Sequence, residues 1–166
     1  MTGPEVSAII PVFNDRPSLE VALKASLETL SGITSEFEIL VAEDGSTDGS
    51  AEFVRNYESR ESRVRLLHYD ERQGRGRALN HAVRESRGNV VCYYDVDLAT
   101  DMKRLPALLS AVCDGSDIST GSRLLPASDI ERTGGREIAS RTYNFLARLF
   151  LSSRIYNHQC GFKAFN

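Results

Sequence analysis

Residues 89–100 read N-V-V-C-Y-Y-D-V-D-L-A-T. The apolar and aromatic run at residues 90–94 predicts a buried strand, and two carboxylates, Asp95 and Asp97, follow it directly. Because residues i and i+2 of a strand face the same side, we expect both acids to aim at one point just past the strand end. Two carboxylates that close repel each other unless a cation lies between them. A hard divalent ion that also holds phosphate oxygens suits that position.

A plainer interpretation of the same residues is a polar turn that caps a helix at Thr100 or Asp101. For an isolated D-x-D this alternative carries more weight. The order of elements along the whole chain favours the metal-site interpretation.

The composition describes an ordinary soluble surface. The chain has 166 residues, 26% of them charged, and a formal net charge of -3, which fits a single domain spanning residues 1–166 and argues against nucleic acid as a partner. Three cysteines without paired spacing indicate a reducing compartment. No apolar run approaches the ~20 residues of a membrane span, so we expect any membrane contact of this chain to be peripheral.

Apolar strand-like runs alternate with helical periodicity along the chain. Strands are expected at residues 6–13, 37–42, 64–68, 90–94 and from 118 onward, and helices after residue 17, around 51–54, after 76, around 105–112 and over 136–152. This alternation predicts an α/β sandwich with a mostly parallel sheet. Ligands of such sheets bind at the carboxyl ends of the strands. Those ends carry acidic and small residues here, at 13–15, 43–45, 95–97 and 121–123.

The C-terminal third leaves two questions open. Residues 124–135 form a polar stretch that reads as a mobile segment or lid. The amphipathic helix expected over 136–152 either packs on its own core or lies near lipid headgroups. The chain ends directly after an apolar patch at residues 160–162, and we expect the domain to be truncated there.

Four segments in this order resemble a family 2 inverting glycosyltransferase of the GT-A fold, a three-layer α/β sandwich with a mostly parallel central sheet. The segments are P-V-F-N-D at 11–15, E-D-G-S-T-D at 43–48, G-R-G at 74–76 and D-V-D at 95–97. Within that family, G-S-R at 121–123 and Q-C-G-F-K at 159–163 are similar to the dolichyl-phosphate hexose synthases, especially the glucosyl-transferring branch.

This resemblance implies residue roles at the positions that match. Residues of the first two segments would form the nucleotide site, with Asp44 bonding the base. The D-V-D segment would hold the sugar diphosphate with Mg²⁺ or Mn²⁺, and Asp97 would be the more direct metal ligand. The implied donor site comprises Pro11, Phe13, Asp15, Asp44, Asp95, Val96 and Asp97, and the implied acceptor-phosphate site comprises Arg123, Arg136 and Ser140. Arg123 joins the two aspartates as an implied catalytic residue.

The chain departs from the family pattern at two positions. Ala99 stands where some mannose synthases have a Gln that completes the metal shell, and Asn157 stands where the glucosyl branch commonly has Asp. A hydroxyl acceptor needs a general base. A phosphate monoester has a second pKa of about 6 and is mostly ionised at neutral pH, so it attacks without one. A chain with Asn157 and the two arginines therefore suits a lipid-phosphate acceptor.

The resulting expectation is a metal-dependent hexosyltransferase that uses UDP-glucose or a GDP-mannose type of donor, at the cytoplasmic face of a membrane. Two alternatives stay open. One is a related enzyme with a saccharide hydroxyl as acceptor, and the other is a non-catalytic nucleotide-sugar-binding module. Asp44 suits uracil and guanine equally, so the base stays open.

Several other features have plain interpretations. G-R-G lacks the third glycine of a dinucleotide-binding turn, because Leu79 occupies its place. Arg72, Arg75 and Arg77 are either a solvated positive face or include one residue that faces a diphosphate. Lys163 either closes on the donor phosphates or is solvated. The three histidines lack metal-ligand spacing and are expected to be structural or on the surface.

Overall fold

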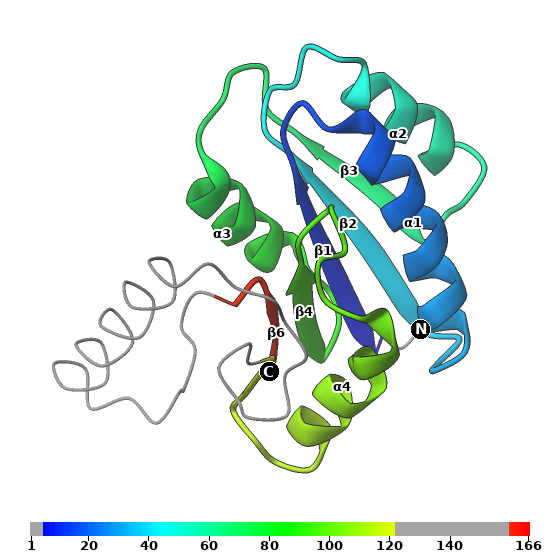
Figure 1. Cartoon of the computed structure of the whole chain (residues 1–166), viewed down its shortest axis with the longest axis vertical. Helices are drawn as coiled ribbons and strands as arrows, with labels where there is room; N and C mark the ends of the chain where they lie inside the picture. The colour runs from blue at the N-terminus through cyan, green and yellow to red at the C-terminus, as the bar shows by residue number, and fades with distance from the viewer. Residues whose placement is uncertain (1–4, 122–159) are drawn as a thin grey trace, which may run out of the picture.

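The computed structural model describes residues 5–121 and 160–166, in which helices cover both faces of a six-stranded sheet (Figure 1). The strands are β1 (Val6–Val12), β2 (Phe37–Glu43), β3 (Val64–His68), β4 (Val90–Tyr94), β5 (Ile118–Thr120) and β6 (Phe162–Phe165). The helices are α1 (Arg16–Ser31), α2 (Ser50–Glu58), α3 (Arg75–Glu85) and α4 (Leu105–Cys113), with a short 3-10 helix, η1, at Met102–Arg104.

The order in which the chain adds strands to the sheet reverses between β1 and β4. The strand order is β3-β2-β1-β4-β6-β5, and β1 pairs in parallel with both β2 and β4. The chain therefore builds outward from β1 to β3 and then crosses back to the other side of β1. Such a switch point opens a crevice at the carboxyl ends of the two central strands, which are here β1 and β4.

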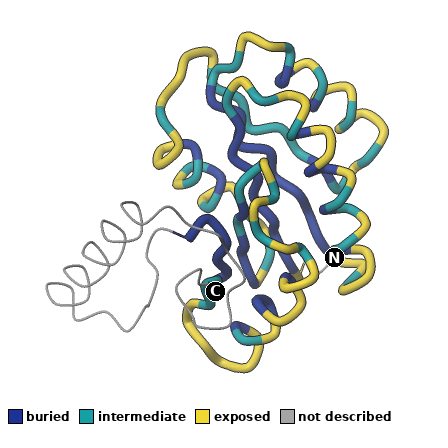
Figure 2. Tube along the Cα trace, viewed as in Figure 1, coloured by how far each residue is buried: buried dark blue, intermediate teal, exposed yellow. Residues whose placement is uncertain are grey.

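Two apolar cores lie on the two faces of the sheet. One face packs against α1, α2 and α4, through residues such as Leu23, Val54 and Leu108. The other packs against α3, through Ala78 and Ala82. Because both faces are covered, every residue of β1 and β2 is buried (Figure 2), as is typical of parallel strands between helical layers.

The predicted elements that fall on the described residues are confirmed with small shifts at their ends. The strands at 64–68 and 90–94 have the predicted bounds. The plainer interpretation of the acidic turn is also found in part, because Asp101 caps η1 by accepting a hydrogen bond from the Lys103 N–H at 3.0 Å. The expected lid and the helix over 136–152 lie outside the described residues.

The sequence interpretation missed β6. This strand runs antiparallel between β4 and β5, with Tyr93 opposite Lys163 and Ile118 opposite Phe165. The C-terminal patch is therefore a strand inserted into the sheet, and β5 pairs with β6 at the sheet edge.

Two further expectations concern the cysteines and membrane spans. Cys92, Cys113 and Cys160 are free thiols, and burial raises the pKa of Cys92 to about 12, as expected of a plain buried thiol. No helix among the described residues has the length and apolar character needed to cross a bilayer.

Candidate active site

A hollow of about 260 Å³ opens at the carboxyl ends of β1 and β2, on the face that α3 covers. Its lining residues come from the two strand ends, the loop before α3 and the first turns of that helix: Pro11, Val12, Phe13, Ala42, Asp44, Arg72, Arg75 and Ala78. The volume is near the lower end of the range for small-molecule sites, about 300 Å³. Three predicted donor-site residues, Pro11, Phe13 and Asp44, line this hollow.

Asp44 connects the hollow to the loop before α3. The residue is 3% exposed, and its Oδ1 accepts the Gln73 N–H at 2.7 Å while its Oδ2 accepts the Gly74 N–H at 2.9 Å. These charge-assisted bonds fix the loop against the end of β2. A carboxylate has about four acceptor positions, so Asp44 retains capacity for a ligand's N–H groups.

Gly45 allows the loop before α3 to lie close to the end of β2. Its φ is +75°, and a Cβ there would lie 2.7 Å from the Arg72 backbone nitrogen. A larger residue would push the loop away from Asp44, so the glycine of the E-D-G segment serves a close backbone approach.

Two guanidinium groups make the hollow suitable for an anion with an aromatic portion. The Arg72 guanidinium lies over the Phe13 ring, 4.1 Å from its centroid, a cation–π geometry. Arg75 also lines the hollow, and because Asp44 is the only carboxylate among the lining residues, the lining carries one excess positive charge. A nucleoside diphosphate has the matching combination of a planar base and negative charge.

Asp95 lies beside this hollow and is held from two sides. Its Oδ1 accepts a hydrogen bond from the Arg75 Nη2 in an ion pair. Its backbone N–H donates to the Gly161 carbonyl at 3.2 Å. A Cβ on Gly161 would lie 1.9 Å from the Asp95 Oδ2, so the carboxylate occupies the space that a side chain at 161 would need.

Asp97 does not share the surroundings of Asp95. Residues 95–98 leave the extended conformation and form a turn, in which the Leu98 N–H donates to the Asp95 carbonyl at 3.1 Å and Leu98 has a φ of 49°. The i, i+2 rule of a strand therefore ends at Tyr94. Val96 and Asp97 line a separate hollow of about 330 Å³ with the start of α1, and Asp97 Oδ1 accepts the Ala99 N–H at 3.0 Å.

Asp15 is placed at the start of α1, outside the lining of the 260 Å³ hollow. It is the N-cap of that helix and accepts the Ser18 N–H at 3.3 Å. Asp48 fixes the same helix end, because it accepts the Arg16 N–H at 2.8 Å and the Ser50 hydroxyl at 2.6 Å. Desolvation raises the pKa of Asp48, but the hydrogen bonds from Ser50 and Arg16 outweigh it and the pKa falls below its ordinary value.

Lys163 is buried in β6, so the solvated interpretation of this residue is wrong. It is 8% exposed, donates to the Cys160 carbonyl and lies 5.8 Å from the centroid of the Tyr93 ring. Burial is the main cause that lowers its pKa, while the nearby Asp95 acts in the opposite direction. Sequence inspection did not find this placement because it depends on β6.

The acceptor-side residues Arg123, Arg136 and Ser140, and also Asn157, lie outside the described residues. Their roles stay predictions, as do the roles of the donor-side residues. Of the three arginines in the loop and first turn of α3, Arg72 and Arg75 line the candidate hollow. Arg77 lines a different one with Tyr69 and Arg84.

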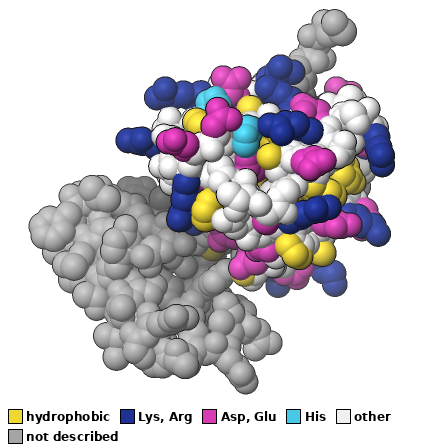
Figure 3. Space-filling model, turned by 90° about the horizontal axis from the view of Figure 1, so that it is seen from above, with side chains coloured by type: hydrophobic (Ala, Val, Ile, Leu, Met, Phe, Trp, Pro, Cys, Tyr) yellow, Lys and Arg dark blue, Asp and Glu magenta, His cyan; other side chains and the backbone are white. Residues whose placement is uncertain are grey.

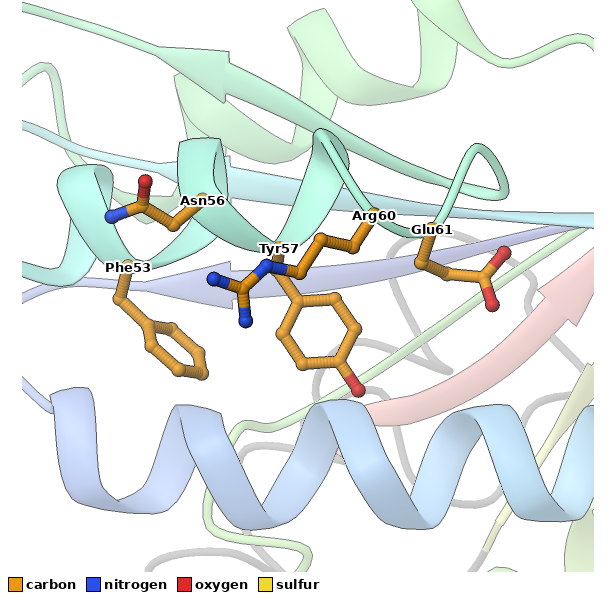
Figure 4. A pocket seen from close by; sticks show the side chains of 5 residues that line it. All are labelled: Phe53, Asn56, Tyr57, Arg60 and Glu61. Atoms are coloured by element: carbon orange, nitrogen blue, oxygen red, sulfur yellow. The ribbon is translucent and has the colours of Figure 1, made fainter.

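A hollow larger than the 260 Å³ one lies away from the carboxyl ends of β1 and β2. Phe53 and Tyr57 project from α2 toward α1 and, with Asn56, Arg60 and Glu61, line about 420 Å³ (Figure 4). Glu61 pairs there with Arg63 at 2.7 Å.

Acidic and basic side chains are interspersed at the end of the molecule that carries the carboxyl ends of the parallel strands (Figure 3). Charge alone therefore does not mark a site, whereas the 260 Å³ hollow lies at the carboxyl ends of parallel strands, where ligands of such sheets bind.

Asp95 offers a carboxylate to a hard divalent ion beside the 260 Å³ hollow, while Asp97 lines a separate hollow. Among the described residues, no group of three or more Asp, Glu, His or Cys side chains is arranged to hold a metal. Mg²⁺ and similar ions take one or two carboxylates and complete their shell with phosphate oxygens and water. Asp95 already accepts a cationic partner in Arg75, so the residues present are compatible with a metal that arrives with a diphosphate.

The fold is that of the GT-A glycosyltransferases. A mannosyltransferase from Pyrobaculum calidifontis, solved with GDP-mannose and Mn²⁺, superimposes with a TM-score of 0.67 at 23% identity, over 98% of this chain and 44% of that one. At this identity the likeness establishes the fold.

The family follows from the sequence comparisons. Residues 7–166 match the model of glycosyl transferase family 2, and the chain belongs to that family. It is 42% identical to glycosyltransferase AglD of Haloferax volcanii over 99% of this chain and 27% of that protein. It is 31% identical to the dolichol-phosphate mannosyltransferase of Pyrococcus furiosus over 76% of this chain and 35% of that protein. The chain thus spans about a quarter to a third of the length of these relatives.

Proposed function

We propose that this protein transfers a hexose from a nucleoside-diphosphate sugar to a polyprenyl phosphate, with inversion at the anomeric carbon. The observation that carries the proposal is the hollow at the carboxyl ends of β1 and β2. Asp44, Phe13 and two guanidinium groups line it, and Arg75 connects it to Asp95. Support for the acceptor class comes from a relative whose name specifies a dolichol phosphate.

The reaction is a single displacement. An oxygen of the acceptor phosphate forms a bond to the anomeric carbon, while the bond from that carbon to the donor's diphosphate oxygen breaks and its electron pair leaves with the nucleoside diphosphate. Negative charge develops on the leaving group, and Arg72 and Arg75 line the hollow where it would lie. A divalent metal held by Asp95 and Asp97 would supply further charge neutralisation when bound.

The acceptor side rests on residues outside the described ranges. We propose that Arg123, Arg136 and Ser140 bind the lipid phosphate and hold it in line for attack. No general base is required, because the phosphate monoester is already ionised at neutral pH. The protein would meet this acceptor at a membrane surface, on the cytoplasmic face.

A transfer assay with the full-length protein tests the proposal. UDP-glucose and GDP-mannose are each supplied with dolichyl phosphate or undecaprenyl phosphate in the presence of Mn²⁺, and the unphosphorylated polyprenol is the matched control. We expect hexosyl transfer to a polyprenyl phosphate and none to the polyprenol. Transfer to saccharide hydroxyls instead, or donor binding without transfer to any acceptor, would contradict it.

The acceptor arginines have a test of their own. Arg123→Ala and Arg136→Ala should each raise the KM for the lipid phosphate, because a charge-assisted contact contributes about 1.5–3 kcal/mol. An unchanged KM in both variants would refute the acceptor assignment while leaving the donor site intact.

A thermal-shift screen identifies the donor. A ligand that binds the native state stabilises it by mass action, so the preferred UDP- or GDP-sugar should raise the Tm most in the presence of Mn²⁺. The resemblance to the glucosyl branch favours UDP-glucose.

A further inference from the structure

One side chain joins the nucleotide hollow to the candidate metal site. Arg75 is the first residue of α3 and lines the hollow with Asp44 and Phe13. Its guanidinium also binds the carboxylate of Asp95, which follows β4. These two contacts place a positive charge between the base side of the hollow and the acid that would hold a metal.

We propose that Arg75 is an internal counter-cation of the metal site. In the metal-free protein it occupies Asp95, and when the metal and the donor bind it is released to the donor's diphosphate. This inference rests on the proposed function. It assigns to Arg75 a role in the order and coupling of ligand binding at that site.

The first support is the restricted position of Asp95. Its Oδ2 lies against Gly161, where an added Cβ would be only 1.9 Å away, and its backbone N–H is bonded to the Gly161 carbonyl at 3.2 Å. The oxygen that Arg75 binds is Oδ1. A metal that binds this carboxylate therefore meets a group that is already paired with the guanidinium, so the two cations compete for it.

The second support is the difference in freedom between the partners. The Arg75 side chain is 53% exposed, and the Asp95 side chain is 34% exposed. Arginine has a long, flexible aliphatic stem that allows its charged end to move. The partner that leaves on metal binding is thus Arg75, while Asp95 stays in place.

The third support is the chemistry of the released group. A guanidinium presents paired N–H donors that match two phosphate oxygens. A nucleotide whose base lies beside Asp44 and Phe13, and whose metal lies at Asp95, carries its diphosphate past Arg75. The released charge then stabilises the donor, so metal and nucleotide should bind with positive coupling.

The test compares Arg75→Gln with Arg77→Gln in the full-length protein. Arg77 is two residues further along α3, contacts Gln73 Oε1 at 3.3 Å and lines a different hollow, so it is a matched control. Mn²⁺ binding without nucleotide is measured by electron paramagnetic resonance, and UDP and GDP binding with saturating Mn²⁺ by calorimetry.

The expected result is a pair of opposite changes. Arg75→Gln should bind Mn²⁺ alone about two- to fivefold more tightly, because the competing exposed ion pair is gone. It should bind the preferred nucleotide about tenfold or more weakly, because a charge-assisted contact is lost. Arg77→Gln should leave both affinities unchanged. Arg75→Lys, which retains the charge without the fork, should fall between wild type and Arg75→Gln for the nucleotide.

Two results separate this inference from the proposed function. If wild-type protein binds nucleotide with Mn²⁺ but Arg75→Gln binds Mn²⁺ alone no more tightly than wild type, the counter-cation role is wrong and the proposed function stands. If wild-type protein binds neither UDP nor GDP with Mn²⁺, the proposed function fails and the inference with it. A folded Arg75→Gln is verified by its circular dichroism spectrum before either comparison.

Discussion

Gly161 shows how a single backbone position fixes a candidate catalytic group. It lies in the segment before β6, and the Asp95 carboxylate fills the space that any side chain at 161 would take. The sequence contains this glycine in the Q-C-G-F-K segment, but its contact with the D-V-D segment becomes visible only when β6 is placed beside β4.

Gly161→Ala should therefore displace the Asp95 carboxylate. We expect Mn²⁺-dependent nucleotide binding to weaken by at least tenfold, and stability to fall by about 1–3 kcal/mol because the site is overpacked. Calorimetry and denaturant unfolding measure the two effects. Gly76→Ala is the control, because a Cβ at Gly76 meets nothing within 4 Å. It should preserve binding and raise stability by up to about 1 kcal/mol. Wild-type nucleotide affinity in Gly161→Ala would show that the position of Asp95 does not matter.

Asp44 carries a second prediction at this scale. Asp44→Asn replaces one carboxylate oxygen with an NH₂ group that faces the backbone N–H groups of the loop before α3. We expect a loss of about 1–3 kcal/mol in the free energy of unfolding together with weaker nucleotide binding.

The control for Asp44→Asn is Asp70→Asn, whose side chain is fully exposed; it should change neither quantity. If Asp44→Asn unfolds at the same denaturant concentration as wild type, the hydrogen bonds to Gln73 and Gly74 do not hold the loop.

At the scale of elements, β6 connects the C-terminal segment to the site. Phe162 is 1% exposed and its ring lies 6.4 Å from that of Tyr94, centroid to centroid. The Tyr94 hydroxyl in turn donates to Ser26 of α1 at 2.7 Å. The strand thus packs into the core that α1 and α4 share with the sheet.

Phe162→Ala should destabilise the protein by about 3–5 kcal/mol, the usual cost of removing a buried aromatic ring. Urea unfolding measures this change. Phe165→Ala, at the end of the same strand and only partly buried, should cost clearly less. Equal losses in the two variants would indicate that β6 does not pack as described.

The sequence predicts the parallel part of the fold because its signals are local. The strands at 64–68 and 90–94 have their predicted bounds, since each is a short apolar run between turn residues. β6 has only four residues, and its pairing with β4 links positions about 70 residues apart, such as Tyr93 and Lys163. Pairing over that separation has no signal in the composition of F-K-A-F.

For the candidate site, too, the sequence predicts what depends on local signals and misses what depends on tertiary contacts. Pro11 lies near the carboxyl end of β1, Phe13 and Asp44 directly follow β1 and β2, and all three line one hollow, as expected for a parallel sheet. The expectation that Asp95 and Asp97 face one point depended on continued strand geometry, and the turn at 95–98 ends that geometry. The contributions of Arg72 and Arg75 depend on the loop that Gly45 and Asp44 hold in place, a tertiary contact that spacing does not reveal.

In the whole molecule, the proposed donor site occupies one position at an edge of the sheet. The carboxyl ends of β1 and β2 form a cationic, aromatic-lined hollow, and Arg75 of its lining pairs with Asp95, which follows β4. The larger hollow lined by Phe53 and Tyr57 lies between α2 and α1 (Figure 4). A nucleotide and a metal ion should therefore select the first position.

The most direct measurement is a crystal structure of the full-length protein with Mn²⁺ and the preferred nucleotide, with anomalous scattering used to locate the manganese. We predict a manganese peak at Asp95 and Asp97, the base beside Asp44 and Phe13, and the Arg75 guanidinium on the diphosphate. Nucleotide and manganese bound elsewhere, such as beside Phe53 and Tyr57, would contradict the account.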